Sequence, residues 1–193
     1  MTERVTIRLA VPDDSTVLSA ISRAAKAQWG YSDELLDLWA EDLAVSGVFI
    51  ARNYVLCAVV GDEIIGFAAV SRHEAACELE HLWVRPDWMR RRVGEQLMDR
   101  VTAHLRASGA SELRIVSDPH AEGFYLALGA RRIGEVESKP EGRRLPLLVL
   151  DLGQRTISRS GRAQARLLSR RSPASPTAEP TRHPTGSRSP RRA

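Results

Sequence analysis

The stretch WVRPDWMRRRVGEQLMDRV, residues 83–101, is the part of the chain from which the fold can be inferred. An apolar segment from Leu79 to Val84 leads into Pro86, and three consecutive arginines follow before Gly94 and a run with helical spacing. This order predicts a strand, a basic turn and the start of a helix. Free backbone N–H groups and the positive end of the helix dipole meet at such a corner, which suits it to bind an anion and above all phosphate. The arginines add charge and forked donors.

The spacing of this segment narrows the choice of ligand. Neither GxxxxGK[ST] nor GxGxxG occurs in the chain, which argues against a P-loop and a dinucleotide fingerprint. The segment resembles the acetyl-coenzyme A pattern V-x-P-x-x-[QR]-x-x-G-x-[GA] of the GNAT acetyltransferases. Val84, Pro86 and Gly94 match it, whereas Met89 replaces Gln or Arg and Arg92 replaces Gly. Glycine there lets the backbone approach the pyrophosphate. Arg92 would either crowd that approach or contact phosphate itself. The alternative interpretation is a basic helix start on a solvated surface.

A second segment makes the resemblance more specific. Residues 117–129 read SDPHAEGFYLALG and follow an alternating, strand-like run. The GNAT pattern A-x-x-F-Y-x-x-x-G is present as Ala121, Phe124, Tyr125 and Gly129. The next residues, ARRIGEV, continue into another expected strand. The resemblance covers roughly residues 5–152, and it implies the family's α/β acyl-CoA acyltransferase fold. That fold is a mixed, mostly antiparallel sheet that splays at the coenzyme-binding strand and is flanked by helices.

The apolar patterns predict where the elements of this domain lie. Strands are expected at 5–10, 54–60, 63–71, 77–85, 112–117, 131–136 and 147–152. One helix should open at Pro12, with a buried stripe of Val17, Leu18, Ile21, Ala24 and Ala25. Another should follow Ser32, with Leu35, Leu36, Trp39 and Leu43 on one face. The coenzyme helix is expected at 93–107, and a short helix between Asp118 and Gly129.

The chain divides by charge into a domain, 1–153, and a tail, 154–193. The whole chain has 28 Lys and Arg against 24 Asp and Glu, a net charge of +4. The tail holds ten Arg and one Glu, so residues 1–153 carry 18 basic and 23 acidic side chains, a net −5. The tail is rich in Ser, Pro and Arg and lacks aromatics, so disorder is expected. It is either a dispensable extension, which we favour, or a nonspecific contact for nucleic acid or acidic membranes.

Other features exclude several classes of protein. The sequence has no apolar run near the roughly 20 residues of a membrane span and no signal-peptide pattern at its start, so a cytoplasmic location is expected. Cys57 and Cys77 lack CxxC spacing and are expected to be buried free thiols. The five histidines are scattered, so no metal site is expected. The acidic domain argues against specific nucleic-acid binding.

The resemblance implies acetyl-CoA as the co-substrate and assigns its contacts. Backbone groups of Leu82, Trp83 and Val84 would follow the pantetheine arm, and His120 would lie beside it. Backbone N–H groups of the turn and helix start would bind the pyrophosphate: Arg90, Arg91, Arg92, Val93, Gly94 and Glu95.

Direct acetyl transfer to an amine needs a general acid and a base. Tyr125 is the candidate acid, because the family often has tyrosine there and a phenol with a pKa near 10 is protonated at neutral pH; the alternative is a packing role. Glu78 and Glu80 are the candidate bases, alone or through water. They share a side of the expected strand unless a bulge intervenes, and His81 should point the other way as a packed side chain. A solvated face or arginine partners would equally explain the two acids.

The acceptor is expected to be a small-molecule or peptide amine, which the sequence does not identify. Trp29 and Tyr31 lie between two expected helices and could line its pocket or cover the core. The oligomeric state is also open, a homodimer included. Two other functions compete with N-acetyl transfer. One is a non-catalytic acyl-CoA-binding protein of this fold, for which Met89 and Arg92 leave room. The other is nucleic-acid association through the tail.

Overall fold

The computed structural model describes residues 4–73 and 76–153, so the predictions for the tail lie outside the described residues. The strands are β1 (Thr6–Leu9), β2 (Tyr54–Val60), β3 (Glu63–His73), β4 (Ala76–Val84), β5 (Glu112–Val116), β6 (Arg131–Ser138) and β7 (Arg143–Asp151). The α-helices are α1 (Ser15–Ala27), α2 (Asp33–Leu38), α3 (Ala40–Leu43), α4 (Gly47–Arg52), α5 (Val93–Ala107) and α6 (Glu122–Ala127). Two short 3₁₀ turns, Pro12–Asp14 and Pro86–Trp88, precede α1 and α5.

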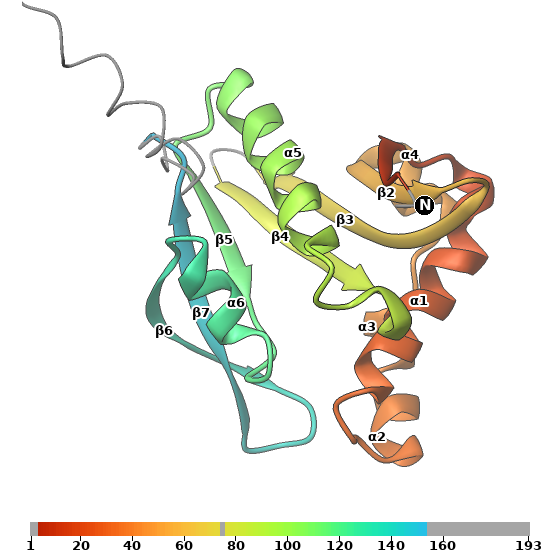
Figure 1. The fold of residues 1–193 in the computed structure, drawn as a ribbon. Coiled ribbons are helices and arrows are strands. Elements are labelled where there is room, and N and C mark those ends of the chain that lie inside the picture. The colour runs from red at the N-terminus through yellow and green to blue at the C-terminus, as the bar shows by residue number, and fades with distance from the viewer. Residues whose placement is uncertain (1–3, 74–75, 154–193) are drawn as a thin grey trace, which may run out of the picture. The chain divides into compact units, whose positions relative to one another are not determined.

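The described strands form one sheet in the order β1-β2-β3-β4-β5-β7-β6 (Figure 1). Every neighbouring pair is antiparallel except β4 and β5, which run parallel. The predicted α/β fold with a mixed, mostly antiparallel sheet is therefore confirmed.

The sheet opens between β4 and β5, as the resemblance predicts. Pairing of the two strands covers only three residues of each and ends where Leu79 meets Ile115. β4 then continues to Val84 along β3 alone, and Figure 1 shows β4 and β5 diverging from this point. The edge of β4 that faces β5 beyond Leu79 therefore has no strand partner in the described structure. Its backbone polar groups are available to a ligand.

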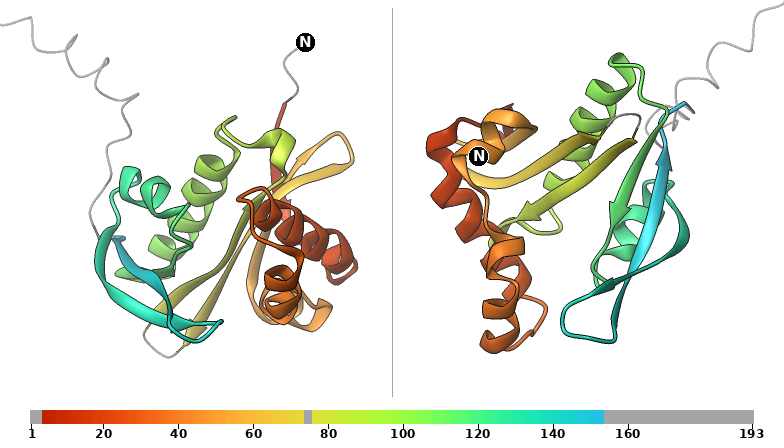
Figure 2. Two further views of the ribbon diagram at one scale, coloured as in Figure 1. Left: turned by 90° about the horizontal axis from the view of Figure 1, so that it is seen from below. Right: turned by 180° about the vertical axis from the view of Figure 1, so that it is seen from behind.

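Helices cover both faces of the β2–β4 part of the sheet (Figure 2). One core lies under α5 and extends to α6, β5 and β7, and the other lies under α1 and α4. Helix α5 spans the predicted residues and buries one stripe: Val93, Leu97, Met98, Val101, Thr102 and Leu105. Burial of this stripe fixes the helix start, and hence the basic turn, against the end of β4.

The first helix is rotated relative to the prediction. Leu18, Ile21 and Ala25 are buried as expected, but Val17 is 45% exposed and Ala24 is exposed too. Their places on the buried face are taken by two polar residues, Ser22 and Lys26. The stripe thus keeps its helical spacing and carries a lysine ammonium into the protein.

Three further differences from the prediction have local causes. The helix capped by Ser32 is interrupted at Trp39, so it forms α2 and α3 rather than one helix. Helix α4 was not expected, because it is only six residues long and ends two residues before β2. β7 begins at Arg143, four residues before the predicted start, because it pairs with a longer β6.

Substitution of Gly66 by alanine should destabilise the fold. A Cβ there would lie 2.8 Å from the Trp83 carbonyl oxygen on β4, so a strand backbone would have to move. We expect a loss of about 1–3 kcal/mol in the free energy of unfolding, measured by chemical denaturation. Gly134→Ala is the matched control, because a Cβ there meets nothing within 4 Å. Equal stability of the two variants would contradict the close approach of β3 to β4.

Candidate functional site

A groove runs along the end of β4 and the start of α5, where the sequence predicts coenzyme contacts. Among the residues that line it are nearly all of the predicted ones: Leu82, Trp83, Val84, Arg90, Arg92, Val93, Gly94, Glu95 and His120. Arg91 does not line it and instead lies over the Trp88 ring, 4.8 Å from its centroid. The groove thus joins the open edge of β4 to the N-terminus of α5.

The basic turn adopts a backbone that glycine usually supplies. Arg90 has φ 61° and Arg92 has φ 63°, both in the left-handed region. Arg92 is the residue before α5, and the family pattern has glycine at its position. The substitution therefore preserves the turn at some conformational cost. The Arg92 side chain is turned to Glu95, with 3.0 Å between Nε and Oε2.

The N-terminus of α5 can bind an anion through its backbone. The first helical hydrogen bond is donated by the Gln96 N–H to the Arg92 carbonyl. The N–H groups of the three preceding residues consequently have no partner within the helix. Gly94 lies beside them, and a Cβ there would lie 3.3 Å from Cζ of Phe124 on α6, so a larger residue would require that ring to shift. This contact is consistent with a small residue in the pattern and joins α6 to the groove.

A second cavity, of about 400 Å³, adjoins the groove between the sheet and the N-terminal helices. Glu78 and Glu80 both line it, as does His81. The expectation that His81 points away from the two acids is wrong. Leu79 pairs with Val70 and His81 with Ala69, so Glu80 is an extra residue in a bulge that shifts the alternation of β4.

The side chains of Glu80 and His81, on either side of this shift, have different surroundings. Glu80 accepts a hydrogen bond from the Ser71 hydroxyl. His81 is packed, as expected, between the rings of Phe49 and Phe67. Burial lowers the pKa of His81 to about 4, so it is neutral at pH 7. Its Nδ1 accepts a hydrogen bond from Trp83 Nε1 at 3.2 Å.

Tyr125 lies where the groove and the second cavity meet, since it lines both. Burial raises the pKa of its phenol, which keeps it protonated at neutral pH. Among the described residues, no side-chain oxygen is both fully buried and without a hydrogen-bond partner, so the Tyr125 hydroxyl is either bonded or accessible. Because Tyr125 lines both cavities, its protonated phenol is a candidate donor to a ligand there.

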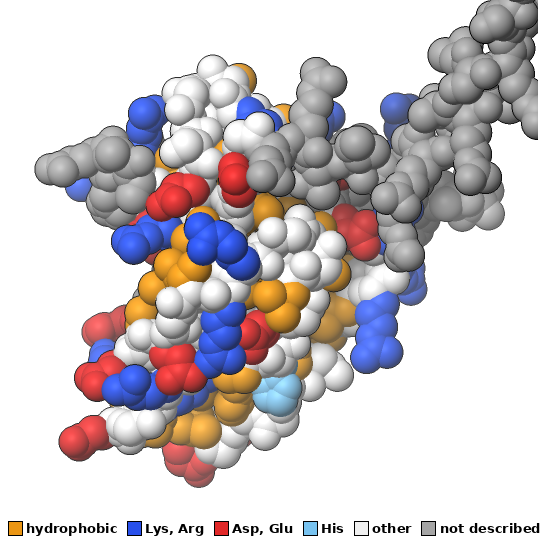
Figure 3. All heavy atoms as spheres, turned by 90° about the vertical axis from the view of Figure 1, so that its left-hand side faces the viewer, with side chains coloured by type: hydrophobic (Ala, Val, Ile, Leu, Met, Phe, Trp, Pro, Cys, Tyr) orange, Lys and Arg blue, Asp and Glu red, His pale blue; other side chains and the backbone are white. Residues whose placement is uncertain are grey.

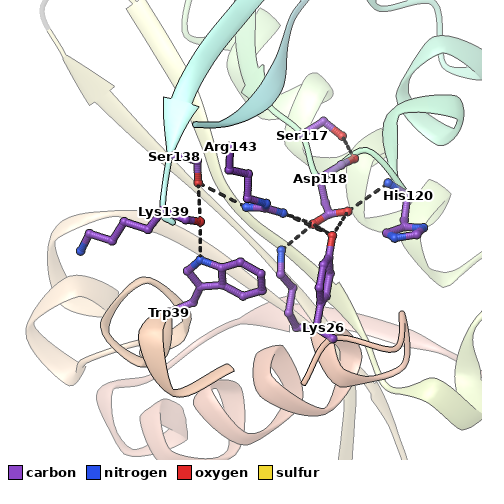
Figure 4. Close-up of polar contacts among 9 residues, drawn as sticks. Lys26, Trp39, Ser117, Asp118, His120, Ser138, Lys139 and Arg143 are labelled. Carbon is purple, nitrogen blue, oxygen red and sulfur yellow. Dashed lines mark hydrogen bonds and ion pairs between the residues drawn. The ribbon is translucent and has the colours of Figure 1, made fainter. Parts of the chain in front are cut away.

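A buried group of charges forms another wall of the second cavity (Figure 4). Asp118 accepts from Lys26 Nζ at 2.6 Å, from Arg143 Nη2 at 3.1 Å and from the Tyr31 hydroxyl at 3.0 Å. The side chains of Lys26, Asp118 and Arg143 are only 9%, 5% and 17% exposed. We call these three residues the Lys26 cluster.

The Lys26 cluster is surrounded by aromatic rings. The Lys26 ammonium lies between 4.7 and 5.9 Å from the ring centroids of four aromatics: Trp29, Tyr31, Trp39 and Trp83. Burial lowers the pKa of Lys26, and the bond to Asp118 opposes that effect. Burial alone would raise the pKa of Asp118, but hydrogen bonds from Lys26 and the His120 backbone outweigh it and hold the pKa below its usual value.

Comparison with known proteins identifies the family. A model of the acetyltransferase (GNAT) domain matches residues 29–145. The chain belongs to the GNAT acetyltransferase family. None of the curated protein sequences matches it.

Solved GNAT structures share its fold at low sequence identity. The PaiA N-acetyltransferase of Thermoplasma acidophilum, solved with coenzyme A, is 19% identical with a TM-score of 0.62; the alignment covers 77% of this chain and 99% of that one. A GCN5-related N-acetyltransferase from Rhodopseudomonas palustris is 23% identical with a TM-score of 0.64, and the alignment covers 78% of this chain and 98% of that one. The ribosomal-protein-S18-alanine N-acetyltransferase of Escherichia coli is 18% identical with a TM-score of 0.59, and the alignment covers 77% of this chain and 94% of that one.

Most of the Lys26 cluster of this GNAT domain was not predicted from the sequence. Trp29, which was predicted, lines both cavities and stacks on His120 with 5.7 Å between ring centroids. Tyr31, also predicted, contacts Asp118. Lys26 and Arg143 were not considered. The available signal was the position of Lys26, four residues after Ser22 and eight after Leu18 on the buried stripe of α1.

Other candidate sites in the described residues are weak. On the face seen in Figure 3, acidic, basic and apolar side chains of the described residues are mixed, and none of the three kinds forms a large patch of its own. Within 4–73 and 76–153, no three His, Cys, Asp or Glu side chains gather as a metal site would require. The helices of the described part are too short or too polar to cross a membrane. Cys57 and Cys77 are buried free thiols, as predicted.

Replacing Asp118 with asparagine should destabilise the GNAT domain strongly. The change leaves Lys26 and Arg143 buried together without their shared counter-ion. We expect a loss of about 3–5 kcal/mol in the free energy of unfolding at pH 7. Because the pKa of Asp118 is lowered in the folded state, its contribution is present above the ordinary pKa of Asp, about 4, and is lost as the pH falls through the folded value. The difference from wild type should therefore narrow in acid.

The matched control is Asp37→Asn, which removes an exposed ion pair with Arg23. An exposed pair contributes at most about 1 kcal/mol. If Asp118→Asn cost no more than this control, the Lys26 cluster would not be a stabilising feature of the fold.

Proposed function

We propose that the protein transfers an acetyl group from acetyl-CoA directly to a primary amine. The observation that carries this proposal is the junction of the two cavities at Tyr125. The coenzyme groove supplies a backbone edge and a helix N-terminus, and the second cavity is lined by carboxylates that suit an amine. A thioester in the groove and an amine in the second cavity would therefore both lie beside Tyr125.

The residues at this junction can perform the required proton transfers. The amine attacks the thioester carbonyl carbon, the C–S bond breaks, and the leaving thiolate takes a proton. Tyr125 supplies that proton from its protonated phenol. Glu80, directly or through a water, accepts the proton that the ammonium must lose before it attacks. The second proton, which leaves the nitrogen as the amide forms, returns to the phenolate of Tyr125. Unpaired backbone N–H groups of β4 polarise the thioester carbonyl.

Substitution of Tyr125 by phenylalanine should separate chemistry from binding. We expect the turnover number to fall on the order of 10²-fold, since a general acid contributes that much or more. Turnover is measured as the rate at which the free thiol of coenzyme A appears. The dissociation constant for acetyl-CoA, measured by calorimetry, should change little because the ring remains. Unchanged turnover would remove Tyr125 from the mechanism. Wild-type protein that binds acetyl-CoA without acetylating any amine would instead indicate a non-catalytic acyl-CoA-binding protein.

The two carboxylates of β4 can be distinguished by matched amide variants. Glu80→Gln should lower kcat/KM at neutral pH on the order of 10²-fold. Glu78→Gln, two residues away on the same cavity wall, should have a smaller effect. The reverse order would assign the base to Glu78, and equal small effects would favour water alone.

A further inference from the structure

The Lys26 cluster carries more positive charge than its contacts neutralise. Two cations share one carboxylate, and all three side chains are largely withdrawn from solvent. Asp42 lines the same cavity and raises the pKa of Lys26 from a distance, but it is exposed and forms no ion pair within the described residues. A buried surplus charge is costly unless another group compensates for it. The cluster is therefore suited to receive an anion.

The cluster also has hydrogen-bond donors to spare. Arg143 donates through Nη1 to Ser138 and through Nη2 to Tyr31 and Asp118, which leaves Nε–H and one Nη1 hydrogen unused among the described residues. Its guanidinium is held over the Trp39 ring at 4.5 Å. Arg143 lines the second cavity, and no described side-chain nitrogen is both fully buried and unbonded, so its unused Nε is accessible.

The position of the cluster indicates which ligand these donors serve. Lys26, Asp118 and Arg143 line the second cavity, and none of them lines the coenzyme groove. The donors therefore face the space of the acceptor and not the path of acetyl-CoA.

The rest of the cavity is complementary to such a ligand in charge and polarity. Carboxylates line it on β4, where Glu78 and Glu80 lie, and Arg143 lines it on β7. β5 lies between those strands in the sheet and lines the cavity with Arg114, the register partner of Glu78, and with Val116, which is 48% exposed. Leu145 and Leu147 of β7 add to the apolar floor. An ammonium is favoured at one end, an anion at the other and aliphatic groups between them.

We propose that the acceptor is an amine that also carries a carboxylate, such as an apolar amino acid or a peptide ending in one. Lys26 and Arg143 hold the carboxylate through charge-assisted hydrogen bonds, while the amine lies toward Tyr125 and Glu80. This inference rests on the proposed acetyl transfer, because it assigns the substrate class of the same site.

Matched acceptors test the assignment with the full chain. Leucine, leucinamide and 3-methylbutylamine share an aliphatic body, and only leucine has a carboxylate. We expect kcat/KM for leucine to exceed that for each of the others by about tenfold or more, as one charge-assisted hydrogen bond provides. Equal or lower values for leucine would overturn the carboxylate assignment.

Variants of two neighbouring arginines assign the effect to the cluster. Arg143→Gln should abolish the preference for leucine over leucinamide, mainly by raising KM for leucine. Arg144→Gln should preserve it, because Arg144 is exposed and pairs with Glu137 outside the cavity. A preference that survives in folded Arg143→Gln would overturn the role of Arg143.

A binding measurement decides the inference even if no amine is acetylated or Arg143→Gln fails to fold. N-acetylleucine and N-acetylleucinamide cannot be acetylated again, and Trp29, Trp39 and Trp83 line the cavity as fluorescent reporters. Titrated into wild-type protein with coenzyme A present, the acid should bind about tenfold more tightly than the amide. Equal affinities, or no binding of either probe, would overturn the proposal. Absence of turnover with selective binding of the acid would refute only the proposed acetyl transfer.

Discussion

The early end of pairing between β4 and β5 is the constraint on which the rest of the structure depends. Three paired residues hold the two halves of the sheet together, and beyond Leu79 the strands diverge. Divergence exposes the edge of β4 to the coenzyme groove and leaves room for the second cavity. The Glu80 bulge lies at the same point, so carboxylates face the cavity where the sheet opens. Both cavities therefore arise from a single change in backbone pairing.

The Lys26 cluster links the two sides of this opening. Lys26 belongs to α1, Asp118 follows β5, and Arg143 begins β7. Trp39 adds a hydrogen bond from Nε1 to the Lys139 carbonyl, 2.8 Å away in the β6–β7 turn. Because the ionic contacts are buried, they are screened little by solvent. The parts of the domain that the open sheet separates are thus connected through side chains.

Local patterns made the fold and the position of the groove beside α5 predictable. The strand, basic turn and helix around Pro86 are encoded by consecutive residues, so the sequence indicated α5 and the groove beside it. The bulge could not be foreseen, since one extra residue in β4 depends on its pairing with β3. Lys26 and Arg143 are 117 positions apart, and their contact with Asp118 arises only from the tertiary fold. A lysine on a buried helical stripe was the one local sign of this contact.

The wall shared by the two cavities has a thermodynamic consequence. Trp29, Leu82, Trp83, Ala121 and Tyr125 line both spaces. Any rearrangement of these side chains that one ligand causes alters the surface that the other ligand meets. Linkage then requires reciprocity: the factor by which a bound coenzyme changes acceptor affinity equals the factor by which a bound acceptor changes coenzyme affinity. The lining common to the two cavities thus offers a route for coupling between the two proposed ligands, and it exists because the sheet opens.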